Sequence, residues 1–186
     1  MKKSLLSLIV IHFFNSSSVL AQYEIKPEQG YTPQIGIMVD MLEDLKNRIV
    51  REVQDLSQEQ TDYLFDEQAN SIGAIVMHLA ATEVYYQVET LEGRSMTKEE
   101  RELWGVASNL GAASREELQG KPVAYYLNLW DQVREKTLEG LKTKDDDWFA
   151  ANIDEGINNH WAWFHVMEHQ AHHRGQIALI KKRLPE

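Results

Sequence analysis

The sequence contains no cysteine, so disulfides and attachment of a lipid through cysteine are excluded. Any thiol chemistry therefore needs a thiol that a substrate brings. Proline is scarce, with 4 residues in a chain of 186. No alternation of apolar and polar residues is long enough to indicate a sheet, and no internal repeat is present. These absences leave a helical fold as the favoured interpretation.

Long hydrophobic runs are also lacking, apart from a short one at the N-terminus. Two lysines precede an apolar run over residues 5–14, and a small-residue motif ends at Ala21. A membrane-spanning helix needs about 20 apolar residues, which this run does not reach. Residues 1–21 therefore predict a signal peptide that is cleaved near Ala21, with export to the periplasm or out of the cell. An uncleaved anchor is the alternative interpretation.

Positive charge is scarce as well. The chain has 19 Lys and Arg residues against 29 Asp and Glu residues, a formal net charge of −10. Losing two lysines with the signal peptide takes this charge to about −12. A chain this acidic repels nucleic acid and anionic lipid, so we expect neither as a partner, and no stable membrane association after signal removal. The remaining length suits one domain with a single core.

Apolar residues at helical spacing mark four long segments, which begin near residues 32, 71, 121 and 158. Residues 22–31 before them are polar and predict a flexible lead-in. Between the second and third segments, Thr97 begins a brief helix that we expect to end at Trp104. Residues 105–120 are small and polar, which favours a long crossover without a core helix. The predicted fold class is therefore all-α, a four-helix bundle over residues 32–186 with a long crossover connection.

Histidines gather near the C-terminus, where five of the seven fall between Asn159 and Ile177. Steps of three and four give one stripe that is apolar except for two histidines: Ala162, Val166, His169, His173, Ile177, Ile180 and Leu184. His169 and His173 should therefore face the core one turn apart, where both rings can reach one ion. His165 and His172 lie on a mixed stripe, and we expect them on the flank or surface.

A third ligand must come from elsewhere, and His78 lies on another mostly apolar segment. A single buried histidine is ordinarily a core residue bonded to a carbonyl or hydroxyl group. Three together favour a metal, because neutral imidazoles in an apolar interior each need partners for two nitrogens. We therefore predict that His78, His169 and His173 bind one divalent ion. Imidazole suits zinc, which we prefer, and also nickel, copper and iron.

The block His169-Gln170-Ala171-His172-His173-Arg174-Gly175-Gln176, preceded by a helix that carries His78, resembles the DinB-like superfamily. These are four-helix-bundle metalloproteins that include the DinB and YfiT-type proteins, and the resemblance covers about residues 32–184. It implies a divalent metal held by one histidine of the second helix and an H-x-x-x-H pair of the last, which fall on His78, His169 and His173. It also implies a homodimer. Some members are metal-dependent thiol S-transferases, and others are proposed to be hydrolases.

Two other metal motifs fit less well. His165 to His169 matches the H-x-x-E-H motif of inverted zincins, with Glu168 as the base. Those peptidases need a further acidic ligand well downstream, and Glu186 is the sole acid there. A di-iron bundle needs Glu-x-x-His pairs, and Glu168 and His172 have the wrong spacing. Haem ligation by methionine and histidine stays open on the sequence alone.

Three histidines leave at least one position of the ion open, which is typical of catalytic zinc. Such an ion lowers the pKa of bound water to about 7 or deprotonates a thiol. We therefore predict a metal-dependent thiol S-transferase or hydrolase that acts on a small molecule, with no catalytic residue assigned. The alternative is a non-catalytic exported binding protein with a structural ion. We expect Gln176 to orient a metal ligand and Arg174 to form an ion pair away from the site.

Overall fold

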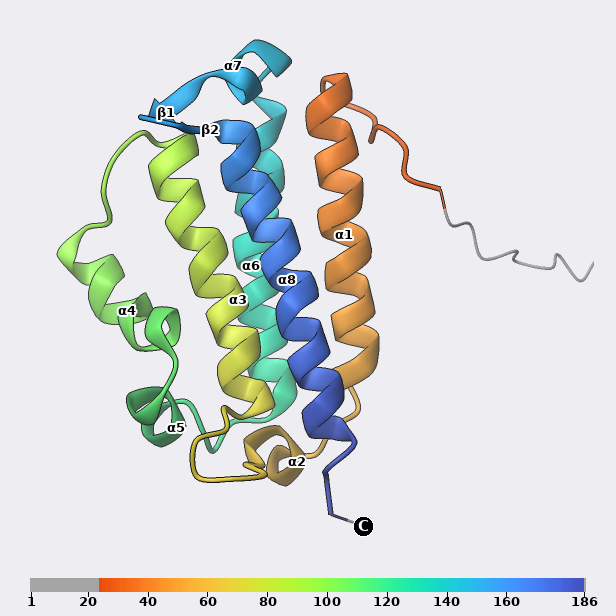
Figure 1. The fold of residues 1–186 in the computed structure, drawn as a ribbon, viewed down its shortest axis with the longest axis vertical. Coiled ribbons are helices and arrows are strands. Elements are labelled where there is room, and N and C mark those ends of the chain that lie inside the picture. The colour runs from red at the N-terminus through yellow and green to blue at the C-terminus, as the bar shows by residue number, and fades with distance from the viewer. Residues whose placement is uncertain (1–23, 186) are drawn as a thin grey trace, which may run out of the picture.

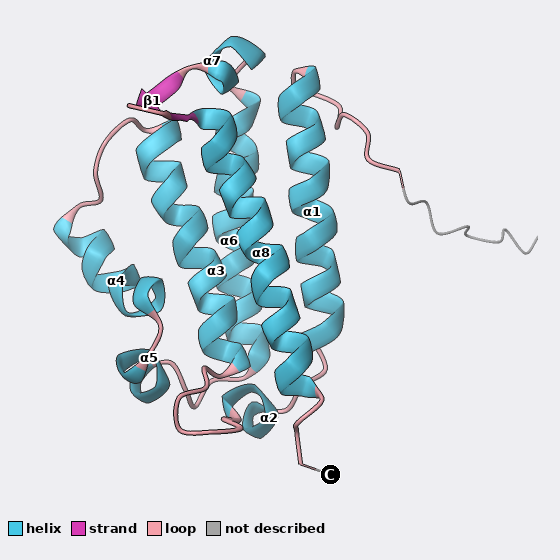
Figure 2. Ribbon diagram, in the orientation of Figure 1, coloured by secondary structure: helices cyan, strands magenta, loops and turns pink. Residues whose placement is uncertain are grey.

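The computed structural model describes residues 24–185, which form a bundle of long helices (Figures 1 and 2). The bundle helices are α1 (Pro33–Val53), α3 (Ile72–Tyr86), α6 (Val123–Lys142) and α8 (Asn159–Lys181). Helix α3 packs on both α6 and α8, and α1 packs on α8. None of the described helices is long and apolar enough to span a membrane. The all-α bundle is confirmed, while the predicted signal peptide lies outside the described residues.

Shorter elements connect these helices: α2 (Gln58–Asp62), α4 (Lys98–Asn109), α5 (Ala112–Glu117), α7 (Asp146–Ala150), β1 (Asn152–Asp154) and β2 (Ile157–Asn158). Helices α4 and α5 return the chain to the end of the bundle where α3 begins, so α3 and α6 run parallel (Figure 1). Helix α7 and the antiparallel pair β1–β2 join α6 to α8 at the opposite end. This connectivity is the predicted long crossover.

The crossover is helical, which corrects the prediction for residues 105–120. Helix α4 begins after Thr97 as predicted, with a reciprocal cap between Thr97 and Glu100, but it does not end at Trp104. It continues because Trp104 and Ala107 bury their side chains in the core beside α3. Helix α5 then buries only Ser114, so its sequence carries almost no apolar periodicity. The small β1–β2 pair was likewise not predicted, because strands this short leave no alternating pattern.

The start of α1 is held by another part of the chain. Thr32 precedes the first turn of α1, but its side chain makes no cap bond within the helix. Asp146 of α7 instead accepts hydrogen bonds from Thr32 Oγ1 (2.5 Å) and from the backbone N–H of Gln34 (3.2 Å). Residues 24–31 form no helix or strand, and the backbone N–H of Glu28 donates to the carbonyl of Gly36 at 3.2 Å. Asp146 thus ties α7 to the end of α1.

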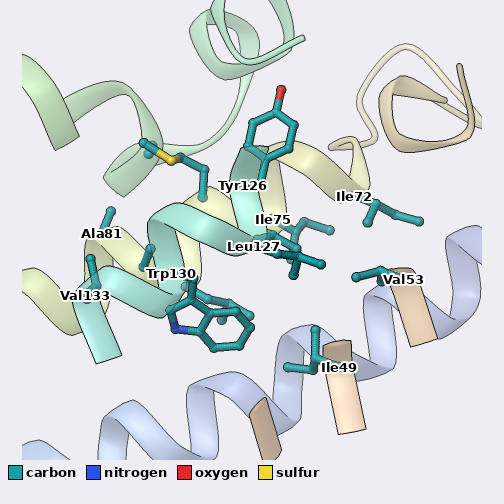
Figure 3. Packing of buried hydrophobic residues seen from close by; sticks show 14 of the residues in the cluster. Ile49, Val53, Ile72, Ile75, Ala81, Tyr126, Leu127, Trp130 and Val133 are labelled. Atoms are coloured by element: carbon teal, nitrogen blue, oxygen red, sulfur yellow. The ribbon is translucent and has the colours of Figure 1, made fainter. Parts of the chain in front are cut away.

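Helix α3 is the centre of the core, since most of its residues are buried on every side. Its neighbours in the larger apolar cluster include Ile49 and Val53 of α1 and Trp130 of α6 (Figure 3). A Cβ atom at Gly73 would lie 2.7 Å from Cε2 of Tyr126, so the close approach of α3 and α6 requires glycine there. The packing fixes the position of α3, and hence of any side chain that it projects toward α8.

The end of α3 widens into the π-helix η1 (Gln87–Leu91). The backbone N–H of Glu92 donates to the carbonyl of Gln87 at 3.1 Å, five residues back. The buried Gln87 side chain donates to the carbonyl of Val133 (2.7 Å) and to Thr137 Oγ1 (2.8 Å), which anchors this wide turn on α6. Single π-turns are rare in helices, and many of those that occur lie at functional sites.

A buried ion pair links α1, α3 and α6. Arg134 donates from Nε to Glu83 Oε1 at 2.7 Å and from Nη2 to Glu83 Oε2 at 2.9 Å, and both side chains are fully buried. Trp130 Nε1 and Thr137 Oγ1 also donate to this carboxylate, and Arg134 Nη1 donates to the carbonyl of Leu42. Burial alone would raise the pKa of Glu83, but Arg134 and the hydrogen bonds outweigh it and lower the pKa.

Candidate metal centre

The structure brings together the three predicted histidines from α3 and α8. The Nε2 atom of His169 lies 3.1 Å from Nε2 of His78 and 3.1 Å from Nε2 of His173. One nitrogen from each ring lies within 4.8 Å of the other two. Within residues 24–185, this is the one group of three or more such side chains that could share an ion. The periodicity therefore predicted the convergence correctly.

The tautomers of two rings follow from their neighbours. Nδ1 of His78 lies 2.8 Å from the backbone carbonyl oxygen of Ala107 in α4. A carbonyl only accepts, so this Nδ1 carries the proton and Nε2 keeps its lone pair. Nδ1 of His173 lies 3.0 Å from Oε1 of Gln176, which has the same effect. Two lone pairs therefore point at Nε2 of His169.

His169 alone cannot donate a hydrogen bond to both neighbouring lone pairs. A single hydrogen on its Nε2 would have to serve both neighbouring lone pairs, and in the described structure its buried Nδ1 has no hydrogen-bond partner. A cation among the three Nε2 atoms removes the conflict, because all three lone pairs then face positive charge. Two nitrogens on a tetrahedral zinc ion are about 3.3 Å apart, close to the 3.1 Å that separates Nε2 of His169 from each of the other two Nε2 atoms. The donor set therefore fits a divalent metal ion.

The electrostatics favour neutral rings. Burial, together with the neighbouring His173 and His78, lowers the pKa of His169 to about 3. Burial and the neighbouring His78 lower the pKa of His173 to about 4, against the opposing effect of its bond to Gln176. Burial also lowers the pKa of His78 against the opposing effect of its bond to Ala107. All three imidazoles are therefore uncharged at neutral pH, the state in which imidazole binds metal.

The remaining histidines of α8 lie outside the cluster, as the helical count predicted. His165 is partly exposed, and its Nδ1 lies 2.8 Å from Oε1 of Glu168. Glu168 is exposed and neither it nor His165 belongs to the cluster, so the H-x-x-E-H motif does not build a zincin site. His172 is exposed and lies 3.0 Å from Nε2 of Gln176. Arg174 forms its ion pair with Glu52 of α1, so the expected role holds.

Sequence reasoning missed the contribution of α4. The carbonyl of Ala107 that holds His78 is a backbone group, and no side-chain pattern predicts its position. The last four carbonyls of any helix lack partners within that helix, so the end of α4 has acceptors to offer. This signal was weak, because the small and polar residues after Trp104 predicted that α4 ends there.

Fold and site together define a class: a DinB-like helical bundle that gathers three histidines from two of its long helices. The family model described as mycothiol-S-transferase matches residues 37–185, a range that contains all three histidines. The chain therefore belongs to the mycothiol-S-transferase family, which lies within the superfamily that the histidine motif resembled. No curated protein matches the chain. Membership implies a thiol substrate.

Proposed function

We propose that this protein is a metal-dependent thiol S-transferase and that His78, His169 and His173 are its metal ligands. The observation that carries the proposal is the convergence of three neutral imidazole nitrogens in a chain of the mycothiol-S-transferase family. Transfer is favoured over hydrolysis because the family is one of thiol transferases. We prefer zinc as the ion, since three nitrogen ligands suit it, with nickel, copper and iron as alternatives.

The chain's own groups prepare this site for a thiol. A divalent ion with an open position lowers the pKa of a thiol that reaches it. The protein has no cysteine, so the sulfur comes from the substrate. Ala107 and Gln176 hold the His78 and His173 rings by their Nδ1 atoms, which keeps both Nε2 lone pairs directed inward. Such outer hydrogen bonds fix ring orientation and raise ligand basicity.

Turnover before and after chelation tests the proposal. Protein purified without a histidine tag is assayed for loss of thiol in the presence of an electrophile, then chelated, then supplied with zinc or nickel. We expect activity to fall at least tenfold on chelation and to return with one of the metals. The His160→Ala variant is the control and should respond to chelation and to added metal as the unchanged protein does. His160 is exposed and stacks on Phe149, away from the cluster.

The competing function is a non-catalytic binding protein in which the ion stabilises the bundle. Chelation would then lower the free energy of unfolding, while metal-loaded protein would leave every thiol unchanged. Thiol turnover that survives complete metal removal would contradict metal dependence as well. The first result rejects the transferase proposal, and the second rejects its dependence on a metal.

Export and dimerisation stay proposals of their own. We propose cleavage near Ala21, which N-terminal sequencing of the mature protein tests; a first residue at Gln22 is expected. Low-molecular-weight thiols are mainly cytoplasmic, so an exported transferase would need its thiol supplied outside.

A homodimer is proposed from the superfamily alone. Light scattering at micromolar concentration measures the molar mass and so tests it.

A further inference from the structure

Gln176 is hydrogen-bonded to two histidines at once, and only one of them belongs to the metal cluster. Its Oε1 lies 3.0 Å from Nδ1 of His173, and its Nε2 lies 3.0 Å from Nε2 of His172. The ring of His172 also meets the ring of His173 edge-on, with centroids 5.1 Å apart and an interplanar angle of 90°. The exposed His172 therefore contacts both a predicted ligand and the side chain that orients this ligand.

The direction of each hydrogen bond follows from the chemistry of the amide. The Nε2 atom of a glutamine only donates, and its Oε1 only accepts. Nε2 of His172 must therefore accept from Gln176, and Nδ1 of His173 must donate to it. A proton on Nδ1 of His173 leaves the lone pair on its Nε2, which lies 3.1 Å from Nε2 of His169. The three side chains thus form one series of hydrogen bonds that ends at a metal-binding nitrogen.

A half-turn of the Gln176 amide would reverse this series. The oxygen and the nitrogen of the amide have nearly the same size, so a half-turn exchanges acceptor and donor without moving either ring. Oε1 would then accept from His172, and Nε2 would donate to Nδ1 of His173. The proton of His173 would in that case lie on Nε2, where it blocks a metal ion. Gln176 therefore supports metal binding in only one of its two orientations.

The other neighbours of Gln176 do not select between these orientations. In the described part of the chain, its amide makes no hydrogen bond except those to His172 and His173. Gln176 also lines a cavity of about 210 Å³, whose walls are mainly apolar. The polar side chains in these walls, Gln68 and Asn70, make no hydrogen bond to the amide. His172 is therefore the group that decides which way the amide faces.

His78 does not depend on such a selection. Its Nδ1 donates to the backbone carbonyl of Ala107 at 2.8 Å. A carbonyl group has no donor to offer, so this contact permits only the tautomer with a free Nε2 lone pair. The tautomer of His173 depends instead on an amide that can turn, and hence on the group at the other end of that amide.

We propose that His172 is a positioning residue of the metal centre, which accepts a hydrogen bond from Gln176 and so holds the amide in the orientation that leaves Nε2 of His173 free for the metal. The inference rests on the proposed function, in which His173 is a metal ligand. It adds an exposed residue that binds no metal itself. It also states what position 172 requires, which is a hydrogen-bond acceptor.

Two substitutions that differ in hydrogen-bond direction test the proposal. His172→Glu supplies an acceptor one helical turn from Gln176, whereas His172→Lys supplies only donors and favours the reversed amide. Competition with a chelator of known affinity measures zinc binding by the untagged full chain. We expect His172→Lys to bind zinc roughly 10-fold to 100-fold more weakly, the range typical for loss of an outer partner. His172→Glu should bind zinc no more weakly than the unchanged protein, and equal affinities in the two variants would overturn the proposal.

Two controls separate hydrogen-bond direction from charge. Ala171→Lys adds the same charge at an exposed position on another face of α8 and should change the affinity less than about fivefold. In the Gln176→Leu background there is no amide to turn, so His172→Lys should cost no more than Ala171→Lys does. Equal losses from these two lysine variants in the unchanged chain, or the full loss in the Gln176→Leu background, would assign the effect to charge and overturn the proposal.

The tautomer of His173 gives a readout that does not require a metal. Nitrogen chemical shifts of labelled histidine rings in the metal-free chain distinguish a protonated Nδ1 from a protonated Nε2. We expect a protonated Nδ1 on His173 in the unchanged protein and in His172→Glu, and a protonated Nε2 in His172→Lys. The same tautomer in all three proteins overturns the proposal even where zinc binds. The expected change in a chain that binds no zinc would support the role of His172 and reject the proposed function alone.

Discussion

The orientation of three rings, more than the number of histidines, defines the metal centre. Helical spacing placed His169 and His173 on one face of α8, and the structure agrees, with their Nε2 atoms 3.1 Å apart. The same count placed His165 and His172 on the flank, where they lie. The tautomers could not be predicted from spacing, because one depends on the Ala107 carbonyl of a helix whose packing is a tertiary property.

Single substitutions in the cluster should separate ligands from neighbours. His169→Ala and His173→Ala should abolish tight binding of zinc while the chain stays helical, because two imidazoles hold a metal weakly. His165→Ala should bind zinc as the unchanged protein does. Calorimetric zinc titration measures affinity, and circular dichroism checks the fold. An equal loss of affinity in all three variants would show that the assignment of ligands is wrong.

Gln176 offers a graded test at the same scale. Its Oε1 accepts from Nδ1 of His173, so Gln176→Leu frees that ring without removing a ligand. Loss of such an outer partner typically lowers metal affinity 10-fold to 100-fold, and we expect a value in this range. Competition with a chelator of known affinity measures it, and an unchanged affinity would leave Gln176 without a positioning role.

Metal-free protein should lose stability in mild acid. The folded pKa values of His169 and His173, about 3 and about 4, lie below the 6.5 of a free imidazole. As the pH falls below 6.5, the unfolded chain takes up protons that the folded chain does not, so the folded state is disfavoured. At pH 5 we expect a loss of about 1–2 kcal/mol for each ring, allowing for solvent screening. Urea unfolding at pH 7.5 and pH 5.0 measures it.

Glu83 does not contribute to this loss of stability between pH 7.5 and pH 5.0. Its folded pKa is lowered from 4.5, so its stabilising effect is complete above the unfolded value and is lost only as the pH falls through the folded value.

The metal-free His173→Leu variant should show a weaker pH dependence of its stability than the unchanged chain. The same dependence in both proteins would show that other groups are responsible.

At the scale of elements, the predictions were best where a helix has one apolar face. The four bundle helices were identified within a few residues, because their buried positions recur with helical period. Helix α5 and the β1–β2 pair were missed because they bury few side chains, and their form depends on neighbours. The π-turn η1 was not predicted, since the anchoring of Gln87 on α6 is a tertiary contact.

Helix α4 should respond to the metal although it supplies no ligand side chain. The carbonyl of Ala107 accepts from His78, and the carbonyl of Val106 accepts from Ser114 Oγ at 2.6 Å, so these groups cap the end of α4. Metal removal frees the His78 ring to turn and weakens the first of these bonds. We expect faster amide hydrogen exchange in the last turn of α4 and no change in α1. Uniform change, or none, would refute this coupling.

At the scale of the whole molecule, the buried pair of Glu83 and Arg134 joins three of the four long helices. The sequence did not reveal this pair, because the two residues are 51 positions apart and charged residues are ordinarily exposed. Once the pair is in place, neither side chain can be removed alone without leaving an uncompensated buried charge. Loss of one partner should therefore cost more stability than loss of both.

Removal of one partner should destabilise the bundle strongly. Arg134→Leu leaves the Glu83 carboxylate buried and unpaired, and we expect a loss of about 3–5 kcal/mol in the free energy of unfolding. The Glu83→Leu, Arg134→Leu double variant should recover part of it, because no isolated charge remains. Arg48→Ala breaks only the exposed pair with Asp44 and should cost less than about 1 kcal/mol. Urea unfolding compares them, and a small loss in Arg134→Leu would contradict the account.

The central claim is that one divalent ion sits among His78, His169 and His173. X-ray absorption at the metal edge, on untagged protein loaded with zinc, tests it most directly, together with the metal-to-chain ratio. We predict one ion per chain and a spectrum dominated by three imidazole nitrogens at about 2.0–2.1 Å. A chain that retains no ion, or an ion that only oxygen atoms coordinate, would contradict the claim.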